Sequence, residues 1–185
     1  MKLRVGTFNV RNGLARDGWN SWPFRRRATA AALRGFDADV VGLQEAFGFQ
    51  ARYLQDHSPG YGFTGSGRSP RRWGERCSVA FGRGDLTLVS SETRWYGATP
   101  DKPGTKLPDA SFPRIATIVR LRQTGGGPTF TVANTTVTTP AYDPVPLVDV
   151  NFTDTLPTGL VIQNDGAHLP SWTCVHNAGA ALAVT

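Results

Sequence analysis

Two side chains that could hold a metal ion stand at the ends of two apolar segments near the start of the chain. Asn9 ends an alternating segment that begins at Leu3, and Glu45 ends an apolar run that begins at Val40. A carboxamide and a carboxylate supply hard oxygen atoms of the kind that bind Mg²⁺, while water and phosphate oxygens fill the remaining positions. A solvated strand-end acid and a turn asparagine are the alternatives. The pair predicts a site for Mg²⁺, with Mn²⁺ as the second candidate ion.

The segments around these side chains predict how the two residues come together. Residues 3–9 and 40–45 have the patterns of β-strands. Residues 24–36 (FRRRATAAALRGF) have the pattern of a helix that ends near a glycine. A strand–helix–strand unit with one crossover favours parallel, neighbouring strands. Asn9 and Glu45 are therefore expected at the same edge of one sheet.

The remaining segments predict a layered fold that contains both helices and strands. In the first helix, Ala28, Ala31 and Ala32 are expected to form the apolar stripe, and Arg25–Arg27 are expected to face water. Residues 57–74 are rich in Gly and Pro and predict no regular structure. A second helix is expected over residues 46–56, and further strands over residues 76–83, 85–91, 114–122 and 128–135. Strands that follow one strand–helix–strand unit are typical of an α+β domain.

These motifs, in this order, resemble the endonuclease/exonuclease/phosphatase superfamily of metal-dependent phosphoesterases. The family's first two motifs are strands ending T-F/W-N and L-Q-E, which here read TFN at 7–9 and LQE at 43–45. The segments GRSPRRWGERCSVAFGR, RWYGATPDKPGTK and DASFPRIAT look like the family's Gly-Glu strand, its Trp-x-x-x-x-Pro turn and its Pro-Arg strand. The resemblance covers about residues 1–134. It implies part of a four-layer α/β/β/α sandwich and a Mg²⁺-dependent phosphoesterase acting on a phosphorylated small molecule or a nucleic acid.

The resemblance implies a role for each of five residues. Glu45 would bind the metal, and Asn9 would orient the metal and the phosphate. Glu75 would hold a catalytic imidazole in one tautomer. Arg114 would pair with phosphate oxygens, and Trp95 would line the substrate groove. The alternatives are a solvated loop acid for Glu75, a solvated arginine for Arg114 and an indole packed against its own turn for Trp95.

A loop rich in arginine precedes the third predicted strand. It contains Arg68, Arg71, Arg72 and Arg76, with Trp73 among them. Basic and aromatic side chains in one loop are compatible with a nucleic-acid backbone or another polyanion. A solvated cluster of charges is the alternative.

The family pattern breaks at the end of the last predicted strand. The family's next motif begins N-T-H-L-D, whereas this chain reads NTTVTT at residues 134–139, so Thr136 stands where a catalytic histidine is expected. Composition changes at nearly the same place, because all 20 Lys and Arg residues lie at or before Arg122. The net charge is +10 up to that residue and −4 after it. The chain is therefore predicted to have one domain over residues 1–134 and an irregular or β-rich tail over residues 135–185.

The tail leaves three interpretations of function open. Without the later motifs, the phosphoesterase is expected to be weak or inactive, and the tail's Asp165 and His168 are expected to be surface residues. Alternatively, DVNFTDTLPTGLVIQNDG resembles the immunoglobulin-like repeats of bacterial surface proteins, which implies a structural role. A truncated or chimeric gene product without an evolved function is the third interpretation.

General composition excludes several classes of protein. Hydrophobic residues make up 39% of the chain and charged residues 18%, which is ordinary for a globular protein and argues against disorder. No apolar run is long enough to cross a bilayer, and no signal-like segment follows Met1. The expectation is a cytoplasmic protein without a membrane span or an obligate protein partner.

Overall fold

The computed structural model describes residues 3–108, 110–135, 152–154, 174–175 and 182–184. The chain divides into two units, and the larger one, Arg4–Thr136, contains the helices and two sheets. The smaller unit contains a three-stranded antiparallel sheet, formed by β8 (Phe152–Asp154), β9 (Cys174–Val175) and β10 (Leu182–Val184) in the order β8-β10-β9. Among the described helices, none is long and apolar enough to cross a membrane.

The first sheet of the larger unit contains the parallel pair that the sequence predicts. Its strands are β1 (Val5–Asn9), β2 (Val40–Ala46), β4 (Arg76–Gly82) and β3 (Tyr61–Thr64), in the order β1-β2-β4-β3. β1 runs parallel to β2 with Asn9 opposite Gln44, and the other pairs are antiparallel. The parallel register confirms the predicted strand–helix–strand unit.

Strand β3 lies in a segment that the sequence predicted to be irregular. Gly62 disfavours a strand when only its local propensity is considered. In the sheet, a Cβ at Gly62 would lie 2.4 Å from Cζ of Phe81, so the ring covers the glycine. The glycine is therefore explained by a cross-strand contact rather than by a turn.

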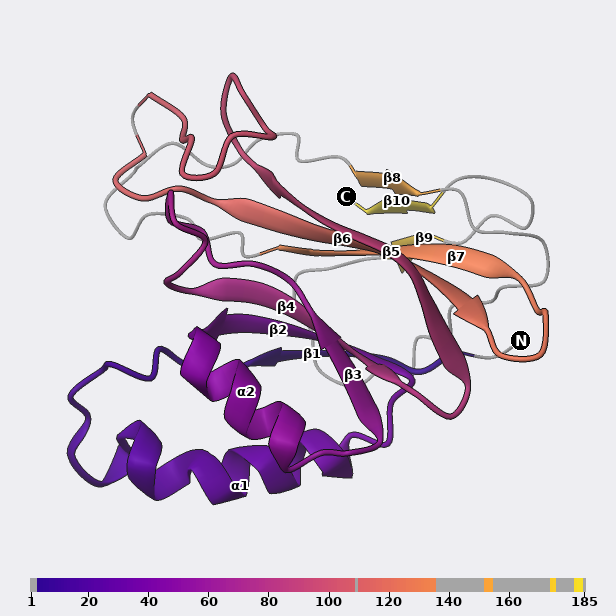
Figure 1. Cartoon of the computed structure of the whole chain (residues 1–185), viewed down its shortest axis with the longest axis horizontal. Helices are drawn as coiled ribbons and strands as arrows, with labels where there is room; N and C mark the ends of the chain where they lie inside the picture. Colours follow the sequence, from indigo (N-terminus) through magenta and orange to yellow (C-terminus); the bar gives the residue numbers. More distant parts are fainter. Residues whose placement is uncertain (1–2, 109, 136–151, 155–173, 176–181, 185) are drawn as a thin grey trace. The chain divides into compact units, whose positions relative to one another are not determined.

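Helices α1 (Trp22–Gly35) and α2 (Gly48–Asp56) cover one face of this sheet, after a short 3₁₀ turn at Gly18–Asn20 (Figure 1). The predicted alanine stripe of α1 is wrong, because Ala28, Ala31 and Ala32 are exposed. Its buried residues are Trp22, Thr29, Ala30 and Leu33. The large Trp22 and Leu33 side chains determine which face packs, because they bury far more apolar area than alanine methyl groups do.

The second sheet lies on the other face of the first sheet and is an antiparallel meander (Figure 1). Its strands are β5 (Leu86–Trp95), β6 (Ile115–Gln123) and β7 (Thr129–Thr135), in the order β5-β6-β7. Cys77 of β4 packs with Trp95 and Ile115 in a buried cluster that joins the two sheets. Helices, first sheet and second sheet form three layers, which confirms the predicted α+β sandwich.

One buried asparagine connects the second sheet to two strands of the first. Asn134, near the end of β7, is 6% exposed. Its Nδ2 donates to the carbonyl oxygens of Leu43 at 3.0 Å and Ser78 at 2.8 Å, and its Oδ1 accepts from Nε2 of Gln44 at 2.7 Å. A Cβ at Gly42 would lie 2.7 Å from that Oδ1. The glycine therefore allows the close approach that these hydrogen bonds require.

We expect Gly42→Ala to lower the free energy of unfolding by roughly 1–3 kcal/mol, because the added methyl group displaces the Asn134 amide. Gly35→Ala is the matched control, since a Cβ there meets no atom within 4 Å. Denaturant unfolding measures both variants. When Asn134→Ala is already present, Gly42→Ala should lower the free energy of unfolding by less, because the clashing amide is gone. An equally large loss in that variant would mean that the added methyl group clashes with another residue.

Candidate active site

Glu45 occupies a β-bulge at the end of β2. Leu43 pairs with Ser78 and Ala46 pairs with Arg76, so β2 contains one more residue than β4 over this stretch. Glu45 has a φ of 61°, which is unusual for a residue with a side chain. Bulges of this kind redirect a side chain and are common beside active sites.

The predicted closeness of Asn9 and Glu45 is confirmed. Nδ2 of Asn9 donates to Oε1 of Glu45 at 2.8 Å, across the parallel strand ends. Oδ1 of Asn9 accepts from the backbone N–H of Arg11 at 2.8 Å. Each amide oxygen has two lone pairs, so this Oδ1 keeps acceptor capacity for another partner.

Asn12, which the sequence analysis overlooked, joins the two candidate carboxylates. Its backbone N–H donates to Oε2 of Glu45 at 3.2 Å, and its Nδ2 donates to Oε1 of Glu75 at 2.8 Å. Its Oδ1 accepts from the N–H of Leu14 at 2.8 Å, as in an Asx turn. The Asn12-Gly13 dipeptide is typical of a turn. No local sequence pattern distinguishes an asparagine that only forms a turn from one that also joins two distant carboxylates.

A buried glutamine of α2 holds the loop that carries Asn12. Gln50 is fully buried, and its Oε1 accepts from the N–H groups of Gly13 at 2.9 Å and Phe47 at 3.0 Å. Its Nε2 donates to the carbonyl oxygen of Arg11 at 2.9 Å. These bonds attach the loop after β1 to the start of α2.

Arg25 of α1 attaches the same loop from the other helix. Its guanidinium donates to the carbonyl oxygens of Val10 at 2.7 Å and Arg11 at 2.9 Å. Burial lowers the pKa of Arg25, and the charge of Arg11 adds to the effect. The sequence expectation that Arg25 faces water is therefore wrong. Arg11 itself pairs with Asp17, and the hydrogen bond from Arg11 lowers the pKa of Asp17.

Glu75 forms an ion pair with a basic side chain, whereas Glu45 forms none with the residues that the structure describes. Oε2 of Glu75 lies 2.8 Å from Nη1 of Arg68, and both side chains are about one-fifth exposed, at 18% and 20%. Arg68 also lies over the ring of Phe112 at 5.0 Å. In the described part of the chain, Glu45 accepts only from the neutral N–H groups of Asn9 and Asn12. Arg11 acts electrostatically on Glu45, but its ion pair is with Asp17.

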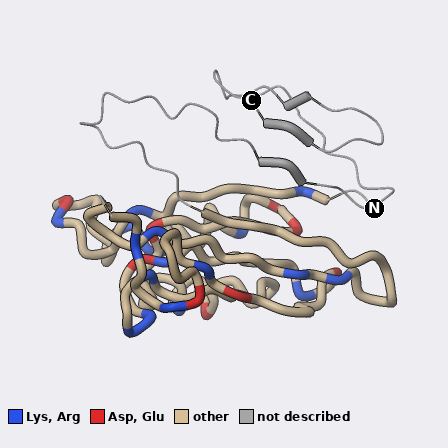
Figure 2. The backbone as a smooth tube through the Cα atoms, turned by 90° about the horizontal axis from the view of Figure 1, so that it is seen from above, with Lys and Arg blue, Asp and Glu red and all other residues tan. Residues whose placement is uncertain are grey.

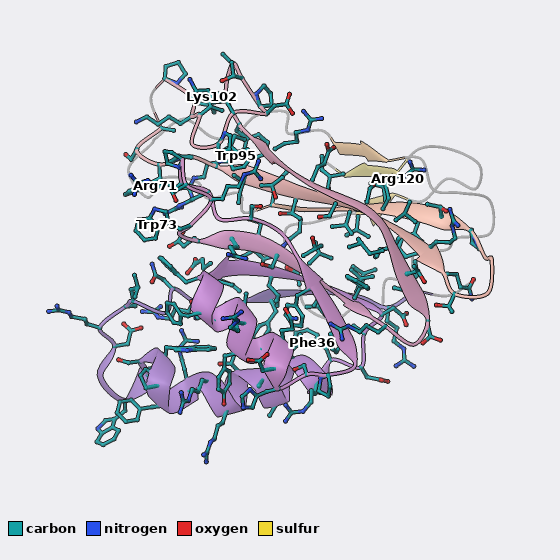
Figure 3. The ribbon with its side chains drawn as sticks, in the orientation of Figure 1. Phe36, Arg71, Trp73, Trp95, Lys102 and Arg120 are labelled. Carbon is teal, nitrogen blue, oxygen red and sulfur yellow. The ribbon has the colours of Figure 1, made fainter. Side chains whose placement is uncertain are left out.

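Trp95 differs from the expectation of a groove-lining aromatic. It is 1% exposed, and its Nε1 donates to the carbonyl oxygen of Arg68 at 2.6 Å. The guanidinium of Arg72 covers its ring at 5.3 Å. An indole this buried supports the arginine-rich loop and offers no face to a substrate. Figure 3 shows Arg71 and Trp73 at the edge of the larger unit, and Trp95 nearer to the strands.

Arg114 immediately precedes β6 and is half-buried. Its carbonyl oxygen accepts from the N–H of Tyr96 at 2.9 Å. Among the residues that the structure describes, none forms a hydrogen bond or ion pair with the Arg114 guanidinium. The structure thus brings Asn9, Glu45 and Glu75 into one network through Asn12, and it records no bond between Arg114 and that network.

The donor set around Glu45 fits Mg²⁺. The described residues contain no group of three or more His, Cys, Asp or Glu that could hold a metal. Mg²⁺, however, is commonly bound through one or two carboxylates and keeps several waters. Within the described residues the carboxylate of Glu45 forms no ion pair, and the Asn9 amide oxygen has a free lone pair, so both can accept a cation as such a site requires.

The described residues supply no imidazole to this network. His57, the one histidine among them, lies at the end of α2, where its Nδ1 is 2.8 Å from the carbonyl oxygen of Tyr53. Its ring stacks on Tyr53 at 3.9 Å between centroids. Thr136, Asp165 and His168 lie outside the described residues.

Comparisons with solved structures connect this geometry to known proteins. The chain is similar to the endonuclease/exonuclease/phosphatase from Bacteroides vulgatus, with 29% identity and a TM-score of 0.68 over 72% of this chain and 51% of that one. It is also similar to a mannosyl-6-phosphatase from Bacteroides thetaiotaomicron, with 28% identity and a TM-score of 0.67 over 72% and 51% of the two chains. The chain thus spans about half the length of each.

A more distant neighbour shares the fold alone. This is TDP2 of D. rerio, solved with a single-strand DNA product, with 19% identity and a TM-score of 0.58 over 76% of this chain and 48% of that one. No curated protein matches the sequence. The model of the endonuclease/exonuclease/phosphatase family matches residues 6–171, which is most of the chain. The chain therefore belongs to the endonuclease/exonuclease/phosphatase family of hydrolases.

Proposed function

We propose that this chain binds Mg²⁺ and a phosphate group at the Glu45 end of the first sheet and hydrolyses a phosphoester at a low rate. The substrate class is a phosphorylated small molecule or a nucleic acid. The observation that carries the proposal is the Asn12 bridge, which fixes Glu45 and Glu75 in one network beside the strand ends. Metal and phosphate sites need oxygen and N–H groups held in this way.

Each candidate residue has a distinct part in this proposal. Glu45 and Asn9 hold Mg²⁺, or Mn²⁺ in its place, and Asn12 keeps the Glu45 carboxylate directed toward the ion. When bound, the metal polarises the phosphate and offsets its negative charge. Glu75 is the positioning residue for the imidazole that the family motif has at position 136, and Arg114 contacts phosphate oxygens. Trp95 supports the Arg68 loop from the interior.

The low rate is proposed because the described residues bring no histidine to this end of the sheet. General acid–base catalysis by a positioned side chain contributes roughly 10²–10⁴-fold. Thr136, where the family motif has histidine, cannot take a proton near neutral pH.

We propose that residues 1–134 are the N-terminal half of the family's domain and residues 135–185 a separate tail. The division of the structure after Thr136 supports this proposal, whereas the family match continues to residue 171.

Glu45→Gln should abolish Mg²⁺ binding measured by calorimetry, because the neutral amide removes the charge that attracts the ion. Glu92→Gln is the matched control, since Glu92 is an exposed strand acid paired with Arg94. Hydrolysis of a generic phosphodiester and a phosphomonoester should be slow with Mg²⁺ and should fall to background with chelator. Fast chelator-sensitive turnover that disappears in Glu45→Gln would contradict the low-rate proposal. It would indicate that tail residues such as Asp165 and His168 complete the site.

Gln50→Met should loosen the Asn12 loop, because a thioether of similar size cannot make the three hydrogen bonds of the amide. We expect amide hydrogen exchange at Gly13 to accelerate and Mg²⁺ binding to weaken. The loss of unfolding free energy should be roughly 1–3 kcal/mol. Gln55→Met on the exposed face of α2 is the control. Unchanged exchange at Gly13 in Gln50→Met would show that the loop is held by other contacts.

Replacing the residues after Asn134 with the corresponding C-terminal half of the Bacteroides vulgatus protein should produce Mg²⁺-dependent phosphoester hydrolysis. The expected gain over the unmodified chain is at least the roughly 10²-fold that general acid–base catalysis contributes. Glu45→Gln in the fusion should remove that gain. A fusion that folds and binds Mg²⁺ but remains inactive would mean that the N-terminal half is itself defective.

A further inference from the structure

A cavity of about 540 Å³ lies between the start of α2 and the ends of β3 and β4. Its lining includes Arg52, Arg76, Phe49, Phe63, Thr64 and Ser78, and it contains no acidic side chain. Small-molecule sites in proteins commonly have volumes of about 300–1,000 Å³, so this one can hold an organic ligand. Up to Arg122 the sequence contains 20 Lys and Arg residues and 10 Asp and Glu residues, and Figure 2 shows basic residues distributed along the larger unit, so anions are attracted to it.

Arg76 in this cavity is a half-buried cation with few partners. Its Nη1 donates to the carbonyl oxygen of Gly65 at 3.3 Å, and its Nε is buried without a hydrogen-bond partner. Within the described residues, no carboxylate lies within ion-pair distance of it. A guanidinium has five N–H donors and remains charged at neutral pH. Burial without a counter-ion is costly, so the site favours an anion.

The Arg76 cavity is separate from the candidate active site, although the two residues involved are consecutive. Glu75 hydrogen-bonds to Asn12, whereas Arg76 points toward α2. A Cβ at Gly48 would lie 3.1 Å from Nη2 of Arg76, so the glycine leaves room for the guanidinium. Arg52, one helical turn further along α2, lines the same cavity. Two cations thus converge on a space that Glu45 and Asn9 do not line.

We propose that this cavity binds a small organic phosphate, with the phosphate on Arg76 and Arg52 and the apolar part against Phe49 and Phe63. A planar guanidinium pairs with two phosphate oxygens at once, and the hydroxyl group of Ser78 supplies a further donor. The space exceeds what a bare phosphate ion fills, which is why the ligand carries an organic group. The site does not depend on the hydrolytic function proposed above.

The test measures binding of phenylphosphonate, which cannot be hydrolysed as an ester, to the full chain in the presence of chelator. Calorimetry should show tighter binding of phenylphosphonate than of inorganic phosphate. Arg76→Met should weaken phenylphosphonate binding by roughly 10- to 100-fold, since hydrogen bonds to charged groups are lost. Arg114→Met and Glu45→Gln should leave the affinity within about twofold.

The thermal midpoint without ligand provides a second readout. Arg76→Met should keep or raise it, because the variant removes a half-buried unpaired charge and retains an apolar stem. Wild-type affinity in Arg76→Met, or loss of binding in Arg114→Met, would overturn the proposal. If Arg76→Met fails to fold, the Nε–H resonance of Arg76 in the wild-type chain decides: it shifts on adding phenylphosphonate if the site exists, and an unchanged resonance refutes it.

Discussion

The larger unit depends on one buried amide that joins its two sheets. Asn134 donates to a carbonyl of β2 and a carbonyl of β4, and it accepts from the Gln44 side chain. Sheets that pack only through apolar side chains can slide past one another, because apolar contacts are non-directional. Hydrogen bonds in a low-dielectric interior are directional, and leaving them unmade is costly. The Asn134 bonds therefore fix β7 against the strand that carries Glu45.

The segment 42–45 serves packing and chemistry together. Gly42 gives the space for Asn134, Leu43 offers its carbonyl to it, and Gln44 donates to it. The next residue, Glu45, leaves the regular ladder in a bulge with a positive φ. A strained backbone conformation persists only where the surrounding contacts hold it in place. The hydrogen bonds to Asn134 on one side and to Asn12 on the other supply that constraint.

Sequence patterns predicted the parts of this arrangement that depend on short-range periodicity. The strand patterns at 3–9 and 40–45 were sufficient to predict a parallel pair, and with it the contact between Asn9 and Glu45. Asn12 and Gln50 were missed because their partners lie 33 to 63 residues away, and an asparagine before glycine or a glutamine in a helix has no distinctive local pattern. The prediction that Trp95 lines a substrate groove failed for a related reason. An aromatic residue in a loop motif has no local pattern that shows whether its ring is buried.

Glu45 and Glu75 illustrate how surroundings separate two carboxylates that share one bridging residue. Arg68 neutralises Glu75, so this carboxylate is suited to orienting a neighbouring group through hydrogen bonds. Among the described residues, Glu45 accepts hydrogen bonds only from neutral donors and forms no ion pair, so its oxygens are more open to a cation than those of Glu75. Asn9, Asn12, Glu45 and Glu75 all lie within residues 9–75, so the first part of the larger unit forms the whole network. The metal site that we propose would therefore belong to this part of the chain, whereas His57, the one histidine among the described residues, is not part of the network.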